Sequence, residues 1–123
     1  MSEIGSNDDT LINKKCVPCH GGVSALSPAE AVKMLGRLVS SKDGGWQIVE
    51  DGKALRREFK FVDFYRAMSF VNAVAHVANI EDHHPDIECG WGYVRIRYQT
   101  HAIDGLHEND FICAAKIDAL PRH

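Results

Sequence analysis

The sequence predicts an α+β domain, a four-stranded and mainly antiparallel sheet with three helices on one face, in the order α-β-β-α-β-β-α. Three observations lead to this class. A helix-start signature lies at residues 27–30, alternating apolar residues follow a tight-turn dipeptide at 51–52, and two further strand-like segments flank residues 91–92. Hairpins separated by helical segments favour a sheet that its connecting helices cover.

The first helix is expected at 28–40. Ser27 supplies a capping hydroxyl, Pro28 occupies the first helical position, and Glu30 stands where its carboxylate reaches back to the cap. The apolar residues that follow lie on one face: Ala31, Met34, Leu35 and Leu38. This periodicity is typical of a helix with one apolar side.

A β-hairpin is expected next, with strands at 46–50 and 54–61 joined by an Asp-Gly dipeptide at 51–52, which is preferred in type I′ turns. The second strand alternates with a period of two, which sets its register. Its expected buried face consists of Leu55, Phe59 and Phe61, with Arg57 as the exception. The residues expected to face water are Ala54, Arg56, Glu58 and Lys60.

A long helix capped by Asp63 is expected at 64–80. It carries two apolar stripes, one of Phe64, Ala67, Met68, Val71, Val74 and Ala78, and another of Phe70, Ala73 and Val77. A sheet covers only one face of a helix, so the second stripe favours a homodimer or tetramer formed through this helix. A helix sandwiched inside one monomer is the alternative.

The second hairpin is expected at 87–91 and 93–98, followed by a last helix at 108–120 with Asp110 in its first turn, where the helix dipole favours an acid. If this hairpin turns near residues 91–92, residues whose numbers sum to about 183 lie opposite each other. His83 and His84 then lie opposite residues 99–100, next to His101. Three imidazoles are therefore expected at one end of the sheet.

The His83-His84-Pro85 run carries the main chemical signal. Pro85 holds His84 in an extended conformation, so the two adjacent rings point in different directions. Histidine donates and accepts protons near neutral pH, and several at one site favour paired acid and base steps. The sequence has no nucleophile elbow, phosphate loop or GxGxxG motif, so an elimination is favoured over covalent catalysis. A metal site is the rival interpretation, although adjacent histidines on an extended segment chelate one ion poorly.

Composition limits the classes of function. The 123 residues carry 14 basic and 17 acidic side chains, a net charge of -3, so nucleic-acid binding is not expected. No apolar run reaches the roughly 18 residues of a membrane span. The first ten residues show no secretory pattern, so a cytoplasmic location is expected. We expect a flexible arm at 1–25 and a single domain at 26–123.

The expected arm contains a CxxCH motif at 16–20, a spacing typical of covalent haem attachment. Without a secretory signal that role is not expected. Zinc binding by Cys16, Cys19 and His20 would need a fourth ligand, and no second CxxC is present. Incidental thiols are the simplest interpretation, and Cys89 and Cys113 are expected to be ordinary packed residues.

The run at 81–111, EDHHPDIECGWGYVRIRYQTHAIDGLHENDF, resembles the signature of the pterin-4a-carbinolamine dehydratases, and the similarity extends over about 27–120. The resemblance implies a hydro-lyase that removes water from 4a-hydroxytetrahydropterin to give quinonoid dihydropterin, recycling the cofactor of aromatic amino-acid hydroxylases. No metal or organic cofactor is needed for this reaction. The histidines that the resemblance implies to be catalytic are His83, His84 and His101. The pterin-lining residues that it implies are His83, His84, Pro85, Thr100, His101, Ala102 and Ile103, with Asp110 and Asp82 in support.

Within that resemblance, His83 is the expected main acid or base, His101 its partner across the pterin, and His84 an orienting group. The positions that depart from the family pattern are Asn79, Asp104 and His107. A coactivator-type binding protein that dimerises through 64–80 and a paralogue acting on another pterin are the alternatives. The intact histidines favour catalysis, because a scaffold has no need of a histidine cluster.

Overall fold

The computed structural model describes residues 10–19, 21–38 and 44–122. Its sheet pairs antiparallel throughout in the order β1-β2-β4-β3. The strands are β1 (Gln47–Val49), β2 (Ala54–Lys60), β3 (Asp86–Gly90) and β4 (Tyr93–Tyr98). The helices are α1 (Pro28–Leu35), α2 (Phe64–Glu81) and α3 (Glu108–Asp118), with short 3-10 turns η2 (Leu11–Asn13) and η3 (His101–Ile103). The predicted α+β class and element order are confirmed.

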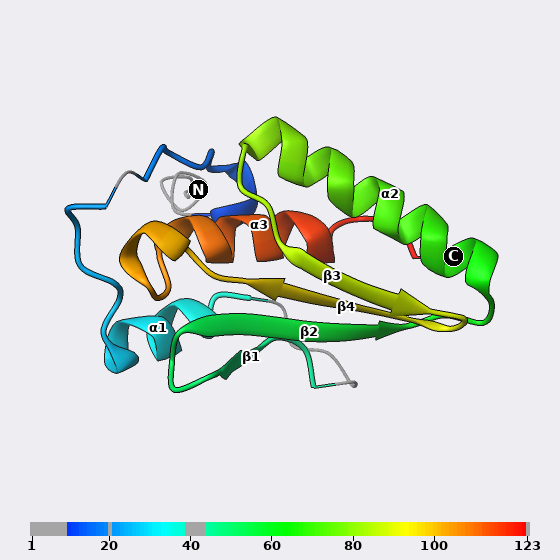
Figure 1. Ribbon diagram of the computed structural model, residues 1–123, viewed down its shortest axis with the longest axis horizontal. Coiled ribbons are helices and arrows are strands. Elements are labelled where there is room, and N and C mark those ends of the chain that lie inside the picture. The colour runs from blue at the N-terminus through cyan, green and yellow to red at the C-terminus, as the bar shows by residue number, and fades with distance from the viewer. Residues whose placement is uncertain (1–9, 20, 39–43, 123) are drawn as a thin grey trace, which may run out of the picture.

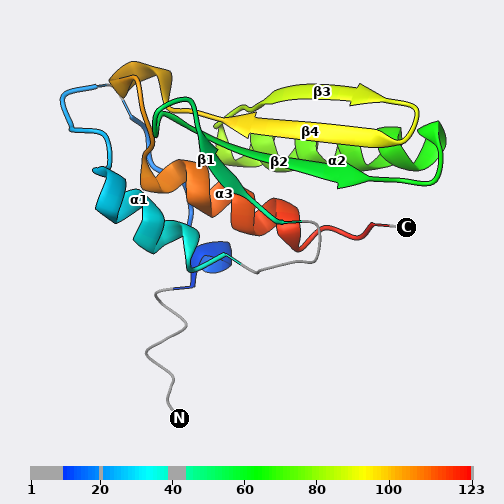
Figure 2. The same ribbon diagram turned by 90° about the horizontal axis from the view of Figure 1, so that it is seen from below.

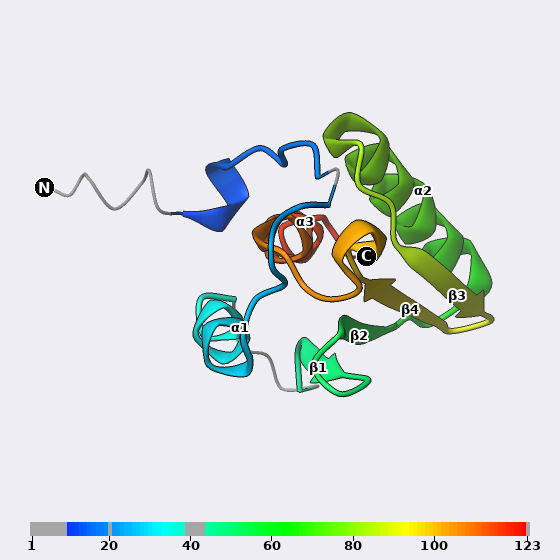
Figure 3. The same cartoon turned by 60° about the vertical axis from the view of Figure 1, so that its left-hand side comes forward.

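The helices cover the sheet along its whole width. In Figures 1 and 3, α2 runs along the β3–β4 hairpin and α3 lies between α2 and α1. The contacts agree, since α2 packs on β3, β4 and α3, whereas α1 packs on β1 and α3. Figure 2 shows β4 leading into the short turn that precedes α3. This path returns the first turn of α3 to the end of the sheet where α2 also ends.

The core lies between these layers. Aromatic rings of β2, β4, α2 and α3 fill its centre, with Phe59 packed against Phe70 at 4.7 Å between ring centroids. The largest fully buried apolar side chains are Tyr98, Phe59, Phe111, Leu55, Ile96, Leu106, Ile112 and Ile117. Burial of each such side chain contributes about 1.5–3 kcal/mol, so this cluster holds α3 firmly on the sheet.

The first helix begins as predicted and ends early. The Ser27 hydroxyl accepts from the Glu30 N–H, and the Glu30 carboxylate accepts from the Ser27 N–H, which completes a capping box. The helix stops at Leu35, before Gly36, a residue with low helix propensity. Leu38 is nevertheless buried, in the turn that follows. The prediction of helix to residue 40 was therefore too long at 36–38, and residues 39–40 lie outside the described part of the chain.

The first hairpin turns at Asp51 and Gly52, which both have positive φ as a type I′ turn requires. The Lys53 N–H closes the turn on the Glu50 carbonyl at 3.1 Å. One side chain of β2 was placed wrongly, because Ala54 is fully buried and does not face water. A single methyl group on a strand is easily covered by the longer side chains around it.

Arg57, the exception on the apolar face of β2, is buried and ion-paired. Its Nη1 donates to Oδ1 of Asp118 at 2.8 Å, and the Trp46 indole N–H donates to the same oxygen at 2.8 Å. The guanidinium also lies 4.5 Å from the centroid of the Phe59 ring. The charge is therefore accommodated by a partner on α3, which the period-two pattern alone does not reveal.

α2 is capped by Asp63, whose carboxylate accepts from the Arg66 N–H at 2.9 Å. Its core-facing residues are Ala67, Phe70, Val74, Ala78 and Glu81, so members of both predicted stripes share the buried face. Phe64, placed in the first stripe, is 47% exposed. Self-association through this helix stays a prediction.

The second hairpin has the predicted register, with Asp86 opposite Arg97 and Gly90 opposite Tyr93. β3 forms the edge of the sheet, and its residues are mostly exposed. Cys89 is accordingly exposed, which corrects the expectation that it is packed, whereas Cys113 is fully buried in α3 as expected. An edge strand lacks a neighbour on one side, so an apolar residue type there does not guarantee burial.

The described part of the predicted arm lies against α3. Leu11 is buried in the core, and Lys14 pairs with Glu108 at 2.8 Å. The division of the chain at residue 25 stays a prediction, and residues 1–9 and 20 lie outside the described part. Within that part, none of the helices is both long enough and apolar enough to cross a membrane.

Candidate active site

A pocket of about 580 Å³ opens at the end of the sheet where α2 ends and α3 begins. Its lining comes from the end of α2, the loop after it, the η3 turn, the start of α3, and the N-terminal segment. The lining residues include all three predicted histidines, His83, His84 and His101. Residues from three distant regions of the sequence, 16–19, 80–84 and 99–109, thus meet around one space.

The end of α2 directs His83 inward. Asp82 caps the helix in the left-handed conformation (φ 53°, ψ 43°), and both its N–H and that of His83 donate to the Ala78 carbonyl. Aspartate is among the few residues other than glycine that visit this region readily. The reversal sends the chain toward β3 while His83 turns to the pocket, so Asp82 supports the site through its backbone.

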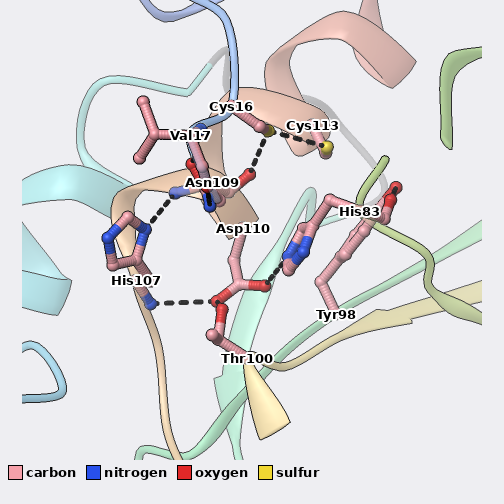
Figure 4. Close-up of polar contacts among 9 residues, drawn as sticks. All are labelled: Cys16, Val17, His83, Tyr98, Thr100, His107, Asn109, Asp110 and Cys113. Atoms are coloured by element: carbon pink, nitrogen blue, oxygen red, sulfur yellow. Dashed lines mark hydrogen bonds and ion pairs between the residues drawn. The ribbon is translucent and has the colours of Figure 1, made fainter. Parts of the chain in front are cut away.

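His83 is held on two sides. Its ring stacks on Tyr98 at 5.2 Å between centroids, and the Tyr98 hydroxyl donates to the His83 carbonyl at 3.2 Å. On its other side, Nε2 lies 2.6 Å from Oδ1 of Asp110, as Figure 4 shows. Only 14% of the His83 side chain is exposed, so the imidazole has a defined orientation and a narrow opening to solvent.

Asp110 is fully buried, and both carboxylate oxygens are used. Oδ1 faces His83, while Oδ2 accepts from the Thr100 hydroxyl and the His107 N–H, each at 2.9 Å. Asp110 also lies in the first turn of α3, where the helix dipole favours a negative charge. His107, which departs from the family pattern, still caps the helix, because its Nδ1 accepts from the Asn109 N–H at 3.0 Å.

The His83 imidazole is tuned toward its protonated form. Burial by itself lowers the pKa of His83, but the hydrogen bond to Asp110 and the charge of that carboxylate outweigh it, so the pKa is raised above the ordinary value. A buried imidazolium next to a buried carboxylate can donate a proton to a bound molecule near neutral pH.

The other two histidines lie at the rim. His84 is exposed, and its Nε2 lies 3.1 Å from Oδ1 of Asn79, the second residue that departs from the family pattern. His101 begins η3 and is also exposed. The two adjacent rings of the His83-His84 pair therefore have different partners, Asp110 and Asn79.

Comparison with known proteins identifies the family. The sequence model described as pterin 4 alpha carbinolamine dehydratase matches residues 24–120, most of the chain. The chain belongs to this family. A protein from Halorhodospira halophila, named provisionally as a pterin-4-alpha-carbinolamine dehydratase, is 50% identical over 111 residues, which cover 90% of this chain and 97% of that one. A Nitrosomonas europaea protein with the same provisional name is 49% identical over 110 residues, covering 89% and 92%.

Two solved structures resemble the fold. A transcriptional coactivator/pterin dehydratase from Brucella melitensis has a TM-score of 0.70 at 33% identity, covering 78% of this chain and 97% of that chain. A pterin dehydratase-like protein described as a RuBisCO assembly factor in the alpha-carboxysome has a TM-score of 0.55 at 23% identity, covering 66% and 94%. The second likeness shows the shared fold alone.

Most residues that the pterin dehydratase signature implied do line this pocket. The lining includes Asp82, Thr100 and Ala102 beside the three histidines. Pro85, Ile103 and the buried Asp110 are not among the lining residues, and the third departing position, Asp104, pairs with Lys53 at 2.9 Å. Pro85 and Ile103 therefore shape the two loops more than they face the space.

Sequence reasoning missed several residues of the pocket. Glu81 and Asn109 are buried polar residues that line it, together with residues 16–19 of the predicted arm. Tyr98, whose ring stacks on that of His83, was also not expected at the site. One sequence signal could have indicated Glu81. It continues the spacing of the buried residues of the helix at 64–80, and a buried charge requires a partner.

The CxxCH motif at 16–20 is only partly described by the structure. Its His20 lies outside the described residues. In the described part of the chain, no three His, Cys, Asp or Glu side chains are placed to hold a metal ion together. The thiols of the motif instead lie in the wall of the pocket, which differs from the interpretation of incidental thiols.

Proposed function

We propose that this chain catalyses the dehydration of a 4a-hydroxytetrahydropterin to the quinonoid dihydropterin, recycling the cofactor of aromatic amino-acid hydroxylases. The observation that carries the proposal is the His83–Asp110 pair at 2.6 Å, in which the His83 imidazole lines a pocket that His84 and His101 also line. Membership of the pterin dehydratase family supports the reaction class. The pocket volume of about 580 Å³ falls within the range of small-ligand sites.

The reaction is an acid-base elimination. The C4a–O bond breaks, the N5–H proton is lost, a C4a=N5 double bond forms, and the hydroxyl leaves as water. A general acid must protonate the departing hydroxyl while a base accepts the N5 proton. The elimination needs no oxidant or reductant. Groups that donate and accept protons, as histidines do, can therefore catalyse it.

His83 is the proposed general acid, because Asp110 raises its pKa and fixes its orientation. His101 is the proposed partner that accepts the second proton across the pterin. His84, hydrogen-bonded to Asn79, is proposed to orient the ring. Thr100 and Ala102 would contact the bound pterin, while Pro85 and Ile103 hold the loops that carry these groups.

We further propose that the protein works in the cytoplasm as a homodimer or tetramer formed through residues 64–80. Two apolar side chains at the start of α2 support an external partner, since Tyr65 is 78% and Phe64 is 47% exposed. The Brucella relative carries the name of a transcriptional coactivator as well as a dehydratase. A coactivator-type binding function is therefore the second candidate, and an active pocket in this chain would count against binding as its only role.

The test is stopped-flow absorbance of chemically generated 4a-hydroxytetrahydropterin with wild type, His83→Ala and His76→Ala. His76 is exposed on α2 and does not line the pocket, so it controls for the substitution itself. We expect His83→Ala to lower the catalysed rate by about 10²–10⁴-fold, and His76→Ala to leave it unchanged. No acceleration by folded wild-type protein would refute the proposed activity.

A further inference from the structure

The segment at residues 16–19, here called the strap, forms one wall of the pocket. All four of its residues, Cys16, Val17, Pro18 and Cys19, belong to the lining. The family model begins at residue 24, so this wall lies outside the matched region. Figure 4 shows Cys16 and Val17 close to Asn109, the neighbour of Asp110 in the first turn of α3.

Two buried polar side chains hold the strap. The carboxamide of Asn109 accepts from the Val17 N–H at 3.0 Å and donates to the Val17 carbonyl at 2.7 Å. Glu81 accepts from the Cys16 N–H at 2.8 Å and also pairs with Lys116 at 2.9 Å. Asn109 is 3% and Glu81 8% exposed, so both would be costly to bury without these partners. The strap is thus held in place by buried side chains that are distant from it in the sequence.

The strap is anchored again on each side. The Cys16 Sγ lies 3.5 Å from the Cys113 Sγ within α3. Beyond the strap, a side-chain carbon at Gly21 would lie 3.4 Å from the Ala102 carbonyl oxygen, so the chain passes close to η3. The strap therefore contacts α3, and the chain just beyond it approaches the turn that carries His101.

The side chains of the strap suit binding more than proton transfer. Val17 is 56% exposed and Pro18 is also exposed, although both belong to the pocket wall. Ligand pockets combine apolar walls with a few oriented polar groups. Here the polar lining includes Thr100 and His83, which the buried Asp110 orients, while the strap supplies apolar surface that a bound ring would cover.

We propose that the strap is a substrate-binding wall of the pterin pocket, which sets affinity for the pterin and takes no part in proton transfer. This inference rests on the proposed dehydratase function. Asn109 acts as the positioning residue of the wall, because its side chain holds the Val17 backbone at both polar groups.

The first test is thiol footprinting of the wild-type protein. Cys19 lies in the pocket wall, whereas Cys89 is exposed on β3 and absent from the lining, so it serves as an internal control. The probe ligand is 7,8-dihydrobiopterin, and alkylation by iodoacetamide is followed by peptide mass spectrometry. At a ligand concentration about ten times the dissociation constant, we expect the Cys19 rate to fall about tenfold. The Cys89 rate should not change.

The outcomes distinguish failure of the strap proposal from failure of the dehydratase proposal. If the pterin binds but Cys19 is alkylated at the same rate with and without 7,8-dihydrobiopterin, the strap proposal is overturned and the dehydratase proposal stands. Failure of the folded protein to bind 7,8-dihydrobiopterin and to accelerate dehydration would overturn both.

The second test is a kinetic comparison of Asn109→Ala with Asn13→Ala. The first change removes both strap hydrogen bonds without adding charge, and the second makes the same change at an exposed position of the same N-terminal segment. We expect Asn109→Ala to raise KM about tenfold, with a smaller effect on kcat. An equal loss in kcat with KM unchanged would contradict a binding role. Circular dichroism and the thermal midpoint establish that each variant is folded.

Discussion

Nε2 of His83 lies 2.6 Å from Oδ1 of Asp110, so a residue after α2 and a residue in the first turn of α3 form one buried pair. The Asp110 carboxylate is oriented by the Thr100 hydroxyl and the His107 N–H, which leaves one oxygen for the imidazole. The pair therefore connects the end of α2, the end of β4 and the start of α3 to the protonation state of one ring. The first two predictions below depend on this linkage.

Replacing Asp110 with Asn should lower the pKa of His83. Burial then acts on the imidazole without the opposing carboxylate, so the protonated form is lost at a lower pH. Each unit by which the pKa falls should lower kcat/KM on the alkaline limb about tenfold, because the protonated fraction falls about tenfold per unit there. The measurement is the pH profile of kcat/KM, whose alkaline limb should move to lower pH.

The control for this profile is Asp86→Asn. Asp86 pairs with Arg97 on β3 and has a side chain that is 70% exposed. Its replacement should leave the alkaline limb where it is in the wild type. An unmoved limb in Asp110→Asn would instead show that another group sets the pH dependence.

The stability contribution of His83 should decrease as pH rises. Its pKa in the folded state is raised above the unfolded value, so the folded protein binds the proton more tightly. The contribution is fully present below about pH 6.5 and is lost as pH rises through the folded-state pKa. Urea denaturation of wild type and His83→Gln across pH 5–9 measures it. A difference in unfolding free energy that grows with pH would contradict the assignment.

Removing Arg57 should destabilise the fold strongly. Arg57 and Asp118 are 3% and 8% exposed at their side chains, and burial raises the pKa of Asp118. Arg57→Ala removes the cation that is hydrogen-bonded to this carboxylate, and breaking such a buried pair costs about 3–5 kcal/mol. Chemical denaturation at pH 7 provides the measurement. The deficit should shrink in acid, where the lone carboxyl becomes neutral.

A surface ion pair provides the comparison for Arg57. Arg66 pairs with Asp63 at the start of α2, and 43% of its side chain is exposed. Arg66→Ala should therefore cost only about 0–1 kcal/mol. Equal losses for the two arginines would mean that burial of the Arg57 pair has no energetic consequence.

Self-association through α2 should be sensitive to charge on its exposed face. Tyr65 lies in the first helical turn, where a glutamate is tolerated by the helix dipole, so Tyr65→Glu tests the surface without weakening the helix. Light scattering after size exclusion should give a dimer or tetramer for wild type and a smaller species for the variant. Trp91→Glu changes an aromatic side chain that is 72% exposed in the β3–β4 turn, and should leave the mass unchanged. A monomeric wild type would refute the prediction.

Local sequence signals predicted most of the fold. The capping box of α1, the positive-φ turn at 51–52 and the pairing of Asp86 with Arg97 all depend on residues close together in the chain. Errors occurred where burial depends on distant segments. Ala54 is covered and Cys89 is not, because one lies on a central strand and the other on the edge of the sheet.

The sequence by itself determined the α+β order, the hairpin registers and the position of the histidines at one end of the sheet, because periodicity, caps and turn residues act over a few neighbouring residues. Only the tertiary structure decided that Asp110 meets His83, that Arg57 meets Asp118, and that residues 16–19 line the pocket. These contacts join segments 27 to 92 residues apart. Their geometry follows from how α3 packs on the sheet, which no local pattern encodes.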